Sequence, residues 1–391
     1  MNAATLHIFI AAGEESGDRL GAPLIAALKR ATGGRVRFSG VGGSQMAAQG
    51  VPSLFPLGDL AIVGILAIAM SLPKILRRIA ETADAVIAAN PDVLVIIDSP
   101  EFTHRVARRV RARAPDIAIV DYVCPSVWAW RPWRARAMRA YVDRVLALLP
   151  FEPAAMQRLH GPPTDFVGHP LGECVDELRP NADEAVRRMS DPPLLLVLPG
   201  SRSSEIRRMA PVFGVALTQV AEKAGPIDVV VPAVPRLLGA VEAAVRSWPV
   251  SRKLTVRIVT DAGEKNAAFR RARAALTKSG TATLELALAG VPMVAAYKVP
   301  LPEELVARLL IRTPSFILAN LALGENVVPE FLQHFCTPQA LADALLPLLT
   351  DTPARRRQIE AFARLDRLMD IGGPPPSDRA AALVLQAIRP I

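Results

Sequence analysis

The stretch Leu6-His-Ile-Phe-Ile-Ala-Ala-Gly-Glu-Glu-Ser-Gly-Asp18 contains the pattern that decides the fold of this chain. The run Leu6–Ala12 is almost entirely apolar, which predicts a buried strand. A loop with two glycines follows it, and a helix is expected over 18–30. A continuous apolar strand that leads through such a loop into a helix is typical of a parallel sheet covered by helices on both faces.

The same pattern recurs along the chain in two series. Helices are expected between the apolar runs, for example over 104–114, 204–224 and 281–289. We therefore predict an α/β protein with two doubly wound, Rossmann-like parallel sheets. The predicted strands are Leu6–Ala12, Val36–Val41, 93–98, 117–123 and 145–150, and then 194–199, 228–232, 255–260, Ala274–Lys278 and 292–297.

The second series opens like the first, with a strand, the loop Pro199-Gly-Ser-Arg-Ser-Ser-Glu205 and a helix. Glycine lets the backbone approach a ligand, and the N–H groups at a helix N-terminus attract an anion. Neither loop has Walker A or Gly-x-Gly-x-x-Gly spacing. Each alone fits a capped helix, because Ser16 and Ser201 are good N-cap types. Two such loops facing each other across a cleft favour a shared ligand site.

Length and composition set further limits. A chain of 391 residues is too long for one ordinary core, so two domains are expected, 1–170 and 190–354, with a helical tail over 355–391. The boundary falls in 162–193, where prolines accumulate and strand character is lost. Three separated cysteines fit a reducing compartment, and no secretory leader precedes the first strand. The net charge of +9 favours anionic partners.

An uncharged apolar stretch, LAIVGILAIAMSL at 60–72, is too short to span a bilayer. Pro73 interrupts it, and Lys74, Arg77 and Arg78 follow. A short apolar helix flanked by cations can lie in the interface of an anionic membrane, which is the interpretation we favour. A buried core helix and a contact in a homodimer are the alternatives. The expected membrane-facing residues are Ile62, Val63, Ile65 and Leu66.

A Pro-containing segment, 121–134, holds three of the four tryptophans, Trp128, Trp130 and Trp133. Aromatic rings and arginines on a loop after a strand predict a surface that meets sugar rings, bases or a membrane. A loop whose rings only fill space between two domains is the alternative.

Several motifs occur in a fixed order through nearly the whole chain. They are Ala12-Gly-Glu-Glu-Ser-Gly-Asp18, Val41-Gly-Gly43, Ile97-Asp-Ser-Pro-Glu-Phe102, Cys124-Pro-Ser-Val-Trp-Ala-Trp-Arg131, Leu149-Pro-Phe-Glu152, Val167-Gly-His-Pro-Leu171, Leu198-Pro-Gly-Ser-Arg-Ser-Ser-Glu-Ile206, Ser279-Gly-Thr-Ala-Thr-Leu-Glu285 and Asn326-Val-Val-Pro-Glu-Phe-Leu-Gln333. In order and spacing the set resembles the lipid-A-disaccharide synthase family. Members of that family are glycosyltransferases of the GT-B type, with two Rossmann-like domains facing each other across a cleft.

The resemblance implies an inverting hexosyltransferase of lipid A (lipopolysaccharide) biosynthesis in a Gram-negative bacterium. The donor would be UDP-2,3-diacylglucosamine and the acceptor 2,3-diacylglucosamine 1-phosphate (lipid X). The acceptor 6-hydroxyl would displace UDP directly and give a β-1,6 disaccharide, with no covalent intermediate and no cofactor. The resemblance also implies a cytoplasmic enzyme, peripheral on the inner face of the cytoplasmic membrane, whose segment 355–391 crosses back to the first domain.

Such a displacement needs a base for the hydroxyl and positive charge for the leaving diphosphate. Asp98 ends the strand 93–98, at the edge where open α/β sheets bind ligands, and the resemblance points to the same residue. A helix-capping aspartate is the alternative there, and Glu14 is the competing base. Arg202 is expected to clamp the diphosphate, because arginine binds phosphate in a bidentate manner. No Asp-x-Asp pair ends a strand, so we expect no essential metal.

The remaining candidates are expected around the substrates. Polar residues of loops at helix starts should donate to the phosphates. The resemblance implies a ribose contact from Glu285 and contacts from the last three residues of the UDP-binding set. That set is Ser16, Gly17, Ser201, Glu205, Ser279, Gly280, Thr281, Thr283, Glu285, Asn320, Glu330 and Gln333. On the acceptor side we expect Trp128 and Trp130 to shape the wall and Arg131 to meet the phosphate.

The sequence leaves two other classes of function open. A transferase of UDP-N-acetylglucosamine to a lipid-linked acceptor, or a UDP-sugar epimerase, would share this fold and differ in the donor. A nucleic-acid-binding protein would suit the positive charge, but no aromatic RNA-binding strand and no helix-turn-helix pattern is present. The expected partners are therefore the two acylated sugars and an anionic membrane surface, and not nucleic acid.

Overall fold

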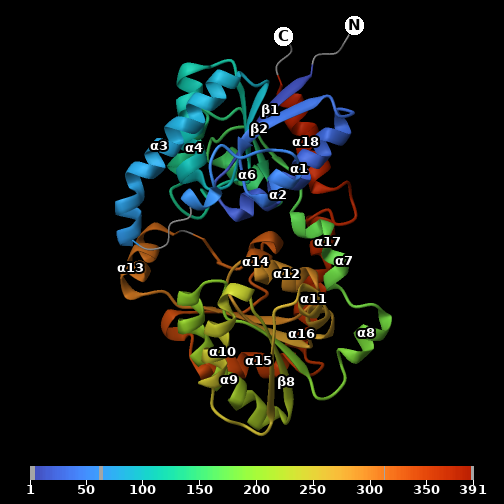
Figure 1. The fold of residues 1–391 in the computed structure, drawn as a ribbon. Helices are drawn as coiled ribbons and strands as arrows, with labels where there is room; N and C mark the ends of the chain where they lie inside the picture. Colours follow the sequence, from blue (N-terminus) through green and yellow to red (C-terminus); the bar gives the residue numbers. More distant parts are fainter. Residues whose placement is uncertain (1–4, 61–64, 312, 389–391) are drawn as a thin grey trace. The chain divides into compact units, whose positions relative to one another are not determined.

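The computed structural model describes residues 5–60, 65–311 and 313–388, without the side chains of 65–71, 302 and 306–309. The contacts divide the chain into two compact units (Figure 1). Unit 1 comprises Met1–Pro170 and Gly372–Ile391, and unit 2 comprises Leu171–Ile371. Of the tail expected to return to the first domain, 372–391 belongs to unit 1 and 355–371 to unit 2.

Within the described residues, unit 1 contains one parallel six-stranded sheet of order β2-β1-β3-β4-β5-β6. The strands are β1 (Leu6–Ala12), β2 (Val36–Val41), β3 (Val93–Ile97), β4 (Ala118–Tyr122), β5 (Arg144–Ala147) and β6 (Thr164–Phe166). The helices are α1 (Glu15–Ala31), α2 (Ser44–Ala48), α3 (Ile65–Ala89), α4 (Pro100–Arg113), α5 (Trp133–Met138), α6 (Glu152–Arg158) and α18 (Pro376–Ala387).

Alternate side chains of the unit 1 strands enter two separate cores. Ile8 and Ile10 of β1 pack with apolar residues of α1 and α18, whereas Phe9 and Ala11 face α3 and α4. Helix α18 lies beside α1 in Figure 1, so the C-terminal helix completes one face of a sheet that begins at the other end of the chain. Because both faces are covered, the strands are continuously apolar, as the pattern predicts.

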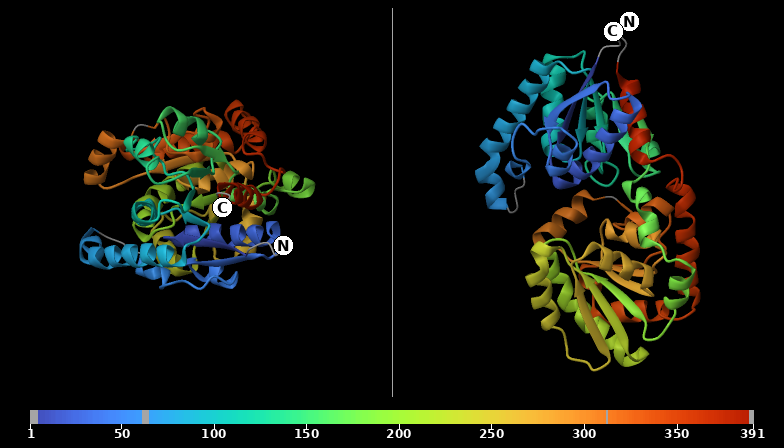
Figure 2. Two further views of the ribbon diagram at one scale, coloured as in Figure 1. Left: turned by 90° about the horizontal axis from the view of Figure 1, so that it is seen from above. Right: turned by 45° about the vertical axis from the view of Figure 1, so that its right-hand side comes forward.

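Unit 2 repeats this architecture, with the sheet order β12-β11-β10-β7-β8-β9 among the described residues. The right-hand view of Figure 2 shows helices on both faces: α9, α10 and α15 pack on one, and α11 and α12 on the other. The strands are β7 (Leu194–Leu198), β8 (Ile227–Pro232), β9 (Leu254–Val259), β10 (Ala274–Lys278), β11 (Met293–Tyr297) and β12 (Glu330–Leu332). The helices are α7 (Val175–Leu178), α8 (Ala182–Arg187), α9 (Ser203–Ala224), α10 (Leu238–Arg246), α11 (Ala262–Arg271), α12 (Ala282–Leu288), α13 (Leu301–Leu310), α14 (Leu318–Leu323), α15 (Pro338–Leu345), α16 (Pro353–Ala363) and α17 (Leu365–Leu368).

The prediction of two doubly wound α/β sheets is confirmed, but one of the two edge strands of each sheet, β6 and β12, was missed. Strands β6 and β12 have three residues each and read Thr-Asp-Phe and Glu-Phe-Leu, which is too short for an apolar run. Strand β6 also lies inside 162–193, the stretch predicted to lack strands. A segment of three residues carries little pattern of its own, so its pairing with a neighbouring strand, and not its composition, makes it a strand.

Helix α3 also differs from the prediction. Its 25 residues run through Pro73, which was expected to interrupt the helix. Proline removes one helical hydrogen bond, and packing of the second half of α3 on the sheet can offset that loss, since Ile79 and Val86 are fully buried. Among the described residues, none of the helices has the length and apolarity needed to cross a membrane.

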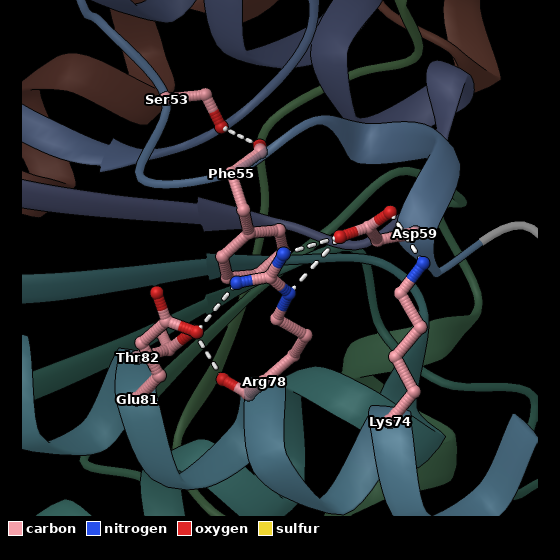
Figure 3. Close-up of polar contacts among 7 residues, drawn as sticks. All are labelled: Ser53, Phe55, Asp59, Lys74, Arg78, Glu81 and Thr82. Atoms are coloured by element: carbon pink, nitrogen blue, oxygen red, sulfur yellow. Dashed lines mark hydrogen bonds and ion pairs between the residues drawn. The ribbon is translucent and has the colours of Figure 1, made fainter.

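A cluster of charged residues fixes the segment before α3 onto that helix (Figure 3). Asp59 accepts hydrogen bonds from Lys74 and from Arg78, and Arg78 also pairs with Glu81. The Arg78 guanidinium lies 4.4 Å from the ring centre of Phe55. Lys74 and Arg78 hold the pKa of the Asp59 carboxyl below its usual value. Two of the three cations expected to face lipid are therefore already paired within the protein.

Candidate active site

Each sheet has one switch point, where the chain leaves its first strand and later adds strands on the other side. The switch point lies between β1 and β3 in unit 1 and between β7 and β10 in unit 2. Ala12 pairs with Ile97, and Leu198 pairs with Thr277, so the strand ends are direct neighbours. Ligands of open α/β sheets bind beside the carboxyl ends of the strands at this point.

Asp98 follows β3 directly at the switch point of unit 1. Asp98 and Ser99 both have left-handed backbone, with φ of 53° and 48°. Such strained non-glycine residues cluster at functional sites. The Ser16 hydroxyl donates a 2.8 Å hydrogen bond to Oδ2 of Asp98, and the Ser99 N–H donates one of 2.7 Å to Oδ1. Ser99, and not Asp98, is the N-cap of α4, so the carboxylate is oriented by its neighbours rather than used as a cap.

Two glycines bring Ser16 onto Asp98. A Cβ atom on Gly13 would lie 2.4 Å from Cβ of Ser99, and one on Gly17 would lie 3.2 Å from the carbonyl oxygen of Ile97. The start of α1 therefore approaches the end of β3 more closely than a side chain permits. Gly17, expected to bind substrate, has this packing role in the structure.

A cavity of about 180 Å³ opens beside Asp98 and lies entirely within unit 1. Its polar and aromatic lining comes from Asp98, His104, Asp121, Trp130 and Arg134. They come from the residue after β3, from α4, from β4 with the loop after it, and from α5, which carries Arg134. The cavity therefore combines the predicted base and Trp130, which was expected on the acceptor side, with His104, Asp121 and Arg134, which were not predicted.

His104 and Asp121 form a buried pair in that cavity, with 4% and 1% of their surfaces exposed. Nε2 of His104 lies 3.0 Å from Oδ2 of Asp121, and its Nδ1 lies 3.1 Å from the Tyr141 hydroxyl. Burial raises the pKa of the Asp121 carboxyl, and the charge of His104 opposes that shift. No aligned hydrogen bond reaches Oδ2 of Asp121 within the described chain. The pair therefore adds a second titratable acid beside Asp98.

The tryptophan segment divides between packing and cavity lining. The Trp128 indole N–H donates to the buried Glu152 carboxylate at 3.2 Å, and its ring meets Phe151 edge to face. Trp130 lines the cavity, and the Arg131 guanidinium stacks 4.3 Å from the centre of its ring. Of the three residues expected on the acceptor side, Trp130 is in the cavity lining and Trp128 and Arg131 are not.

Glu14 and Asp18 flank Ser16 in the first loop. Glu14 is exposed at the N-cap position of α1. Asp18 is buried and accepts hydrogen bonds from the N–H groups of Gly43, Gln45 and Met46. Asp18 thereby holds the Val41-Gly-Gly43 motif against α1. This contact gives a structural role to both the Ala12–Asp18 motif and the Val41–Gly43 motif.

The switch point of unit 2 carries positive charge. Arg202, the N-cap residue of α9, has 75% of its side chain exposed, and its NH1 lies 3.7 Å from Oε1 of Glu205. Glu205 is buried, and its Oε2 accepts from the Ser201 N–H at 3.0 Å. Lys278, at the end of β10, places Nζ 3.1 Å from the same Oε1. One carboxylate therefore lies between two cations.

The other predicted residues of unit 2 are held in contacts around this point. Ser279 donates to Glu330 at 3.0 Å, and the Thr283 hydroxyl donates to the carbonyl of Gly280 at 2.7 Å. Thr281 is exposed at the start of α12. Glu285 pairs with Lys265 of α11 at 3.3 Å. Thr281 thus lies at the surface of the loop, whereas Ser279 is buried against Glu330 and the Thr283 hydroxyl stabilises the loop from beneath.

Asn320 and Gln333 bind backbone rather than open space. The Asn320 amide oxygen accepts from the N–H groups of Val327 and Val328, and its nitrogen donates to the Val328 carbonyl at 3.0 Å. Gln333 exchanges hydrogen bonds with both backbone groups of Val299. Both amides therefore fix the loops that frame β12.

The side chains of the four residues expected to face a membrane lie outside the description. Ile62 and Val63 lie outside the described residues. Ile65 and Leu66 belong to the first turn of α3, but their side chains also lie outside the description. Across 5–60, 65–311 and 313–388, no group of three His, Cys, Asp or Glu side chains is placed to hold a metal ion.

Sequence reasoning missed His104, Asp121, Arg134 and Lys278. Asp121 and Lys278 carried a signal, since each is a charged residue inside an otherwise apolar predicted strand. A charge is rarely buried in a strand without a partner, so each could have been flagged. His104 and Arg134 gave no such signal, because polar residues on helices and loops are ordinary.

The comparisons with known proteins agree with one another. The model of a family described as lipid-A-disaccharide synthetase matches residues 8–370. A lipid-A-disaccharide synthase of Nitrobacter hamburgensis is 61% identical over 98% of this chain and 96% of its own, and one of Rhodospirillum centenum is 44% identical over 98% and 95%. Two solved structures share the fold at low identity. A glycosyltransferase of kitacinnamycin has a TM-score of 0.61 at 17% identity, covering 98% of this chain and 99% of its own. A UDP-GlcNAc 2-epimerase of Neisseria meningitidis has a TM-score of 0.60 at 11% identity, covering 97% and 99%.

Proposed function

The chain belongs to the lipid-A-disaccharide synthase family, and from that premise we propose that it joins UDP-2,3-diacylglucosamine to 2,3-diacylglucosamine 1-phosphate in lipid A biosynthesis. The match over residues 8–370 is the observation that carries the proposal. The two switch points support it, because one presents an oriented carboxylate and the other presents cations. These are the two kinds of group that an inverting transfer from a UDP-sugar requires.

In the proposed reaction the acceptor 6-hydroxyl loses its proton to Asp98. The hydroxyl oxygen then forms a bond to the anomeric carbon of the donor as the bond from that carbon to the β-phosphate oxygen breaks. The electron pair of the broken bond stays on UDP, so the diphosphate gains one negative charge. Asp98 is favoured over Glu14 as the base, because Asp98 is oriented by two hydrogen bonds and lines the cavity.

Arg202 is proposed to receive the diphosphate. Its guanidinium is exposed, at the start of a helix whose N-terminus also attracts anions. The buried Glu205 then acts by shaping the loop and orienting the cations, since its own charge would repel phosphate. Ser279, Gly280 and Thr281 are proposed to supply hydrogen bonds at the rim, and Glu285 to bind the ribose.

The test is a turnover assay with the full chain, the acylated UDP donor and lipid X, run with and without EDTA. We expect disaccharide formation that EDTA does not abolish. Turnover of UDP-N-acetylglucosamine without turnover of its diacyl form would instead support another GT-B enzyme, a lipid-linked acceptor transferase or an epimerase.

We also propose that the protein works on the inner face of the cytoplasmic membrane, where both acylated substrates would be embedded. The stretch 60–72 would enter the interface through apolar side chains. The contribution of charge to membrane binding is smaller than the sequence indicates, since Lys74 and Arg78 pair with Asp59.

Sedimentation with vesicles containing anionic phospholipid should drop when Ile62, Ile65 and Leu66 are replaced by Ser. Unchanged sedimentation would favour a core helix or a homodimer contact, which size measurement in solution distinguishes.

A further inference from the structure

We propose that Lys278 is a second diphosphate-binding residue, which works beside Arg202 at the switch point of unit 2. The inference rests on the proposed function and adds to it a group on a different strand. Arg202 follows β7 and Lys278 ends β10, and these two strands are hydrogen-bonded neighbours. Both side chains therefore leave the sheet at the same edge, where an open α/β sheet binds its ligand.

The position of the ammonium group is well determined by its surroundings. Nζ of Lys278 lies 3.1 Å from Oε1 of Glu205 and 4.6 Å from the ring centre of Tyr297. A Cβ atom on Gly280 would come within 3.3 Å of Nζ, so the ammonium lies directly against the glycine of the Ser279-Gly-Thr281 loop. The loop expected to donate N–H groups to the phosphates is thus the loop that Lys278 touches.

The charges at this point do not balance. Arg202 and Lys278 approach one oxygen of Glu205, at 3.7 Å and 3.1 Å, and two cations against one carboxylate leave one positive charge in excess. Within the described residues, Glu205 is the carboxylate within ion-pair distance of Lys278. An ammonium has three donors, and one carboxylate oxygen does not satisfy them. An anion with at least one negative charge, bound at this edge of the sheet, would neutralise the excess charge and accept hydrogen bonds from the ammonium.

Burial separates the roles of the two cations. The Arg202 side chain is 75% exposed, whereas that of Lys278 is 19% exposed. A partly desolvated ammonium interacts more strongly with phosphate than one in water, since the effective dielectric is lower. Arg202 suits capture of the incoming diphosphate, and Lys278 suits stabilisation of the charge that develops when UDP leaves.

The experiment measures the affinities of the full chain for UDP and for uridine by calorimetry, with Lys278→Met as the variant. We expect UDP affinity to fall by about tenfold, the size of one lost charge-assisted contact, while uridine affinity stays unchanged. UDP and uridine differ only in the diphosphate, so the ratio of the two affinities measures the contribution of the diphosphate contacts. A merely structural role of Lys278 would lower both affinities. Lys223→Met is the matched control, because Lys223 is also paired with a carboxylate, Asp343, but on an exposed surface.

Lys278→Arg is the second variant. It keeps the charge and the pairing with Glu205, so UDP affinity should stay within about threefold of wild type even if the Met variant folds poorly. Equal UDP affinity in wild type and Lys278→Met, with a loss in Arg202→Ala, would overturn the role of Lys278 alone. Failure of the wild type to bind UDP would overturn the proposed function and this inference together.

Discussion

At the switch point of unit 1 two acids, Asp98 and Asp121, line a cavity beside Arg134, whereas at that of unit 2 two cations lie around one carboxylate. The sheets have equivalent topology, and each opens with a strand, a glycine-containing loop and a helix. In unit 1 the loop brings Ser16 to Asp98, and in unit 2 it brings Arg202 and Glu205 to Lys278. One architecture thus carries different charged groups at its two switch points, because the residues at the ends of the paired strands differ.

Two carboxyls of unit 1 and the exposed arginine of unit 2 differ in burial. Asp121 and Glu152 of unit 1 are almost completely buried, and burial raises the pKa of both carboxyls, that of Glu152 to about 7. Arg202 of unit 2 projects into solvent. A buried acid holds a proton easily, and an exposed cation meets a soluble diphosphate easily. The difference predicts that changes in unit 1 alter chemistry and pH response, and changes in unit 2 alter nucleotide affinity.

The largest expected effect comes from Asp98→Ala. We expect kcat to fall by about a thousandfold, which is the usual contribution of a general base, with no change in UDP affinity. Steady-state turnover and calorimetry measure the two quantities. Asp116→Ala removes an exposed carboxylate of the same unit and should leave both unchanged. A kcat near that of wild type would exclude Asp98 as the base and return Glu14 to that role.

Glu152→Gln tests the buried acid behind Trp128. The folded pKa of about 7 exceeds the usual value of 4.5, so the folded state binds the proton more tightly than the unfolded state. Wild-type stability should therefore fall relative to the variant as pH rises from about 4.5 to about 7, by roughly 3 kcal/mol in total, and stay level above that. Melting temperatures of both proteins across this pH range measure the difference. A constant difference would show that Glu152 titrates normally.

Arg202→Ala should lower UDP affinity by about tenfold to thirtyfold, because a charge-assisted bidentate contact is lost. Uridine affinity and the kcat of donor-saturated enzyme should change less than UDP affinity. Arg207→Ala, an exposed arginine further along α9, is the control and should bind UDP as wild type does. If Arg202→Ala keeps full UDP affinity, unit 2 does not hold the diphosphate through this residue.

The smallest effect is expected at the acceptor side, where Arg131→Ala and Arg134→Ala form a matched pair. Both guanidinium groups lie near Glu101, at 3.8 Å and 3.0 Å, but Arg134 lines the cavity and Arg131 stacks on Trp130. We expect a severalfold rise in the KM for the acceptor, larger for Arg134, with little change in the KM for the donor. Equal changes in both KM values would contradict an acceptor-side role.

The sequence predicted most of the strands because each is a buried apolar run between loops. It pointed to Asp98 because a charge at the end of such a run has a specific position in a doubly wound sheet, and to Arg202 because arginine in a loop before a helix suits a phosphate. It placed Trp128 on the acceptor side but did not predict the hydrogen bond of its indole to Glu152. It did not predict His104, whose partner Asp121 lies on the next strand. Partners of this kind depend on which strands are neighbours, and periodicity does not carry that information.

By itself the sequence determined the α/β class, the two sheets, the two glycine-containing loops and the family, since all of these depend on local pattern and motif order. Only the tertiary structure decided which polar and charged side chains are in contact. Ser16 and Asp98 are 82 positions apart, yet they share a hydrogen bond because β1 and β3 are neighbours. Glu205 and Lys278 meet because β7 and β10 are neighbours. Strand order brings distant residues within a few ångströms, and the electrostatics of each switch point follow from that order.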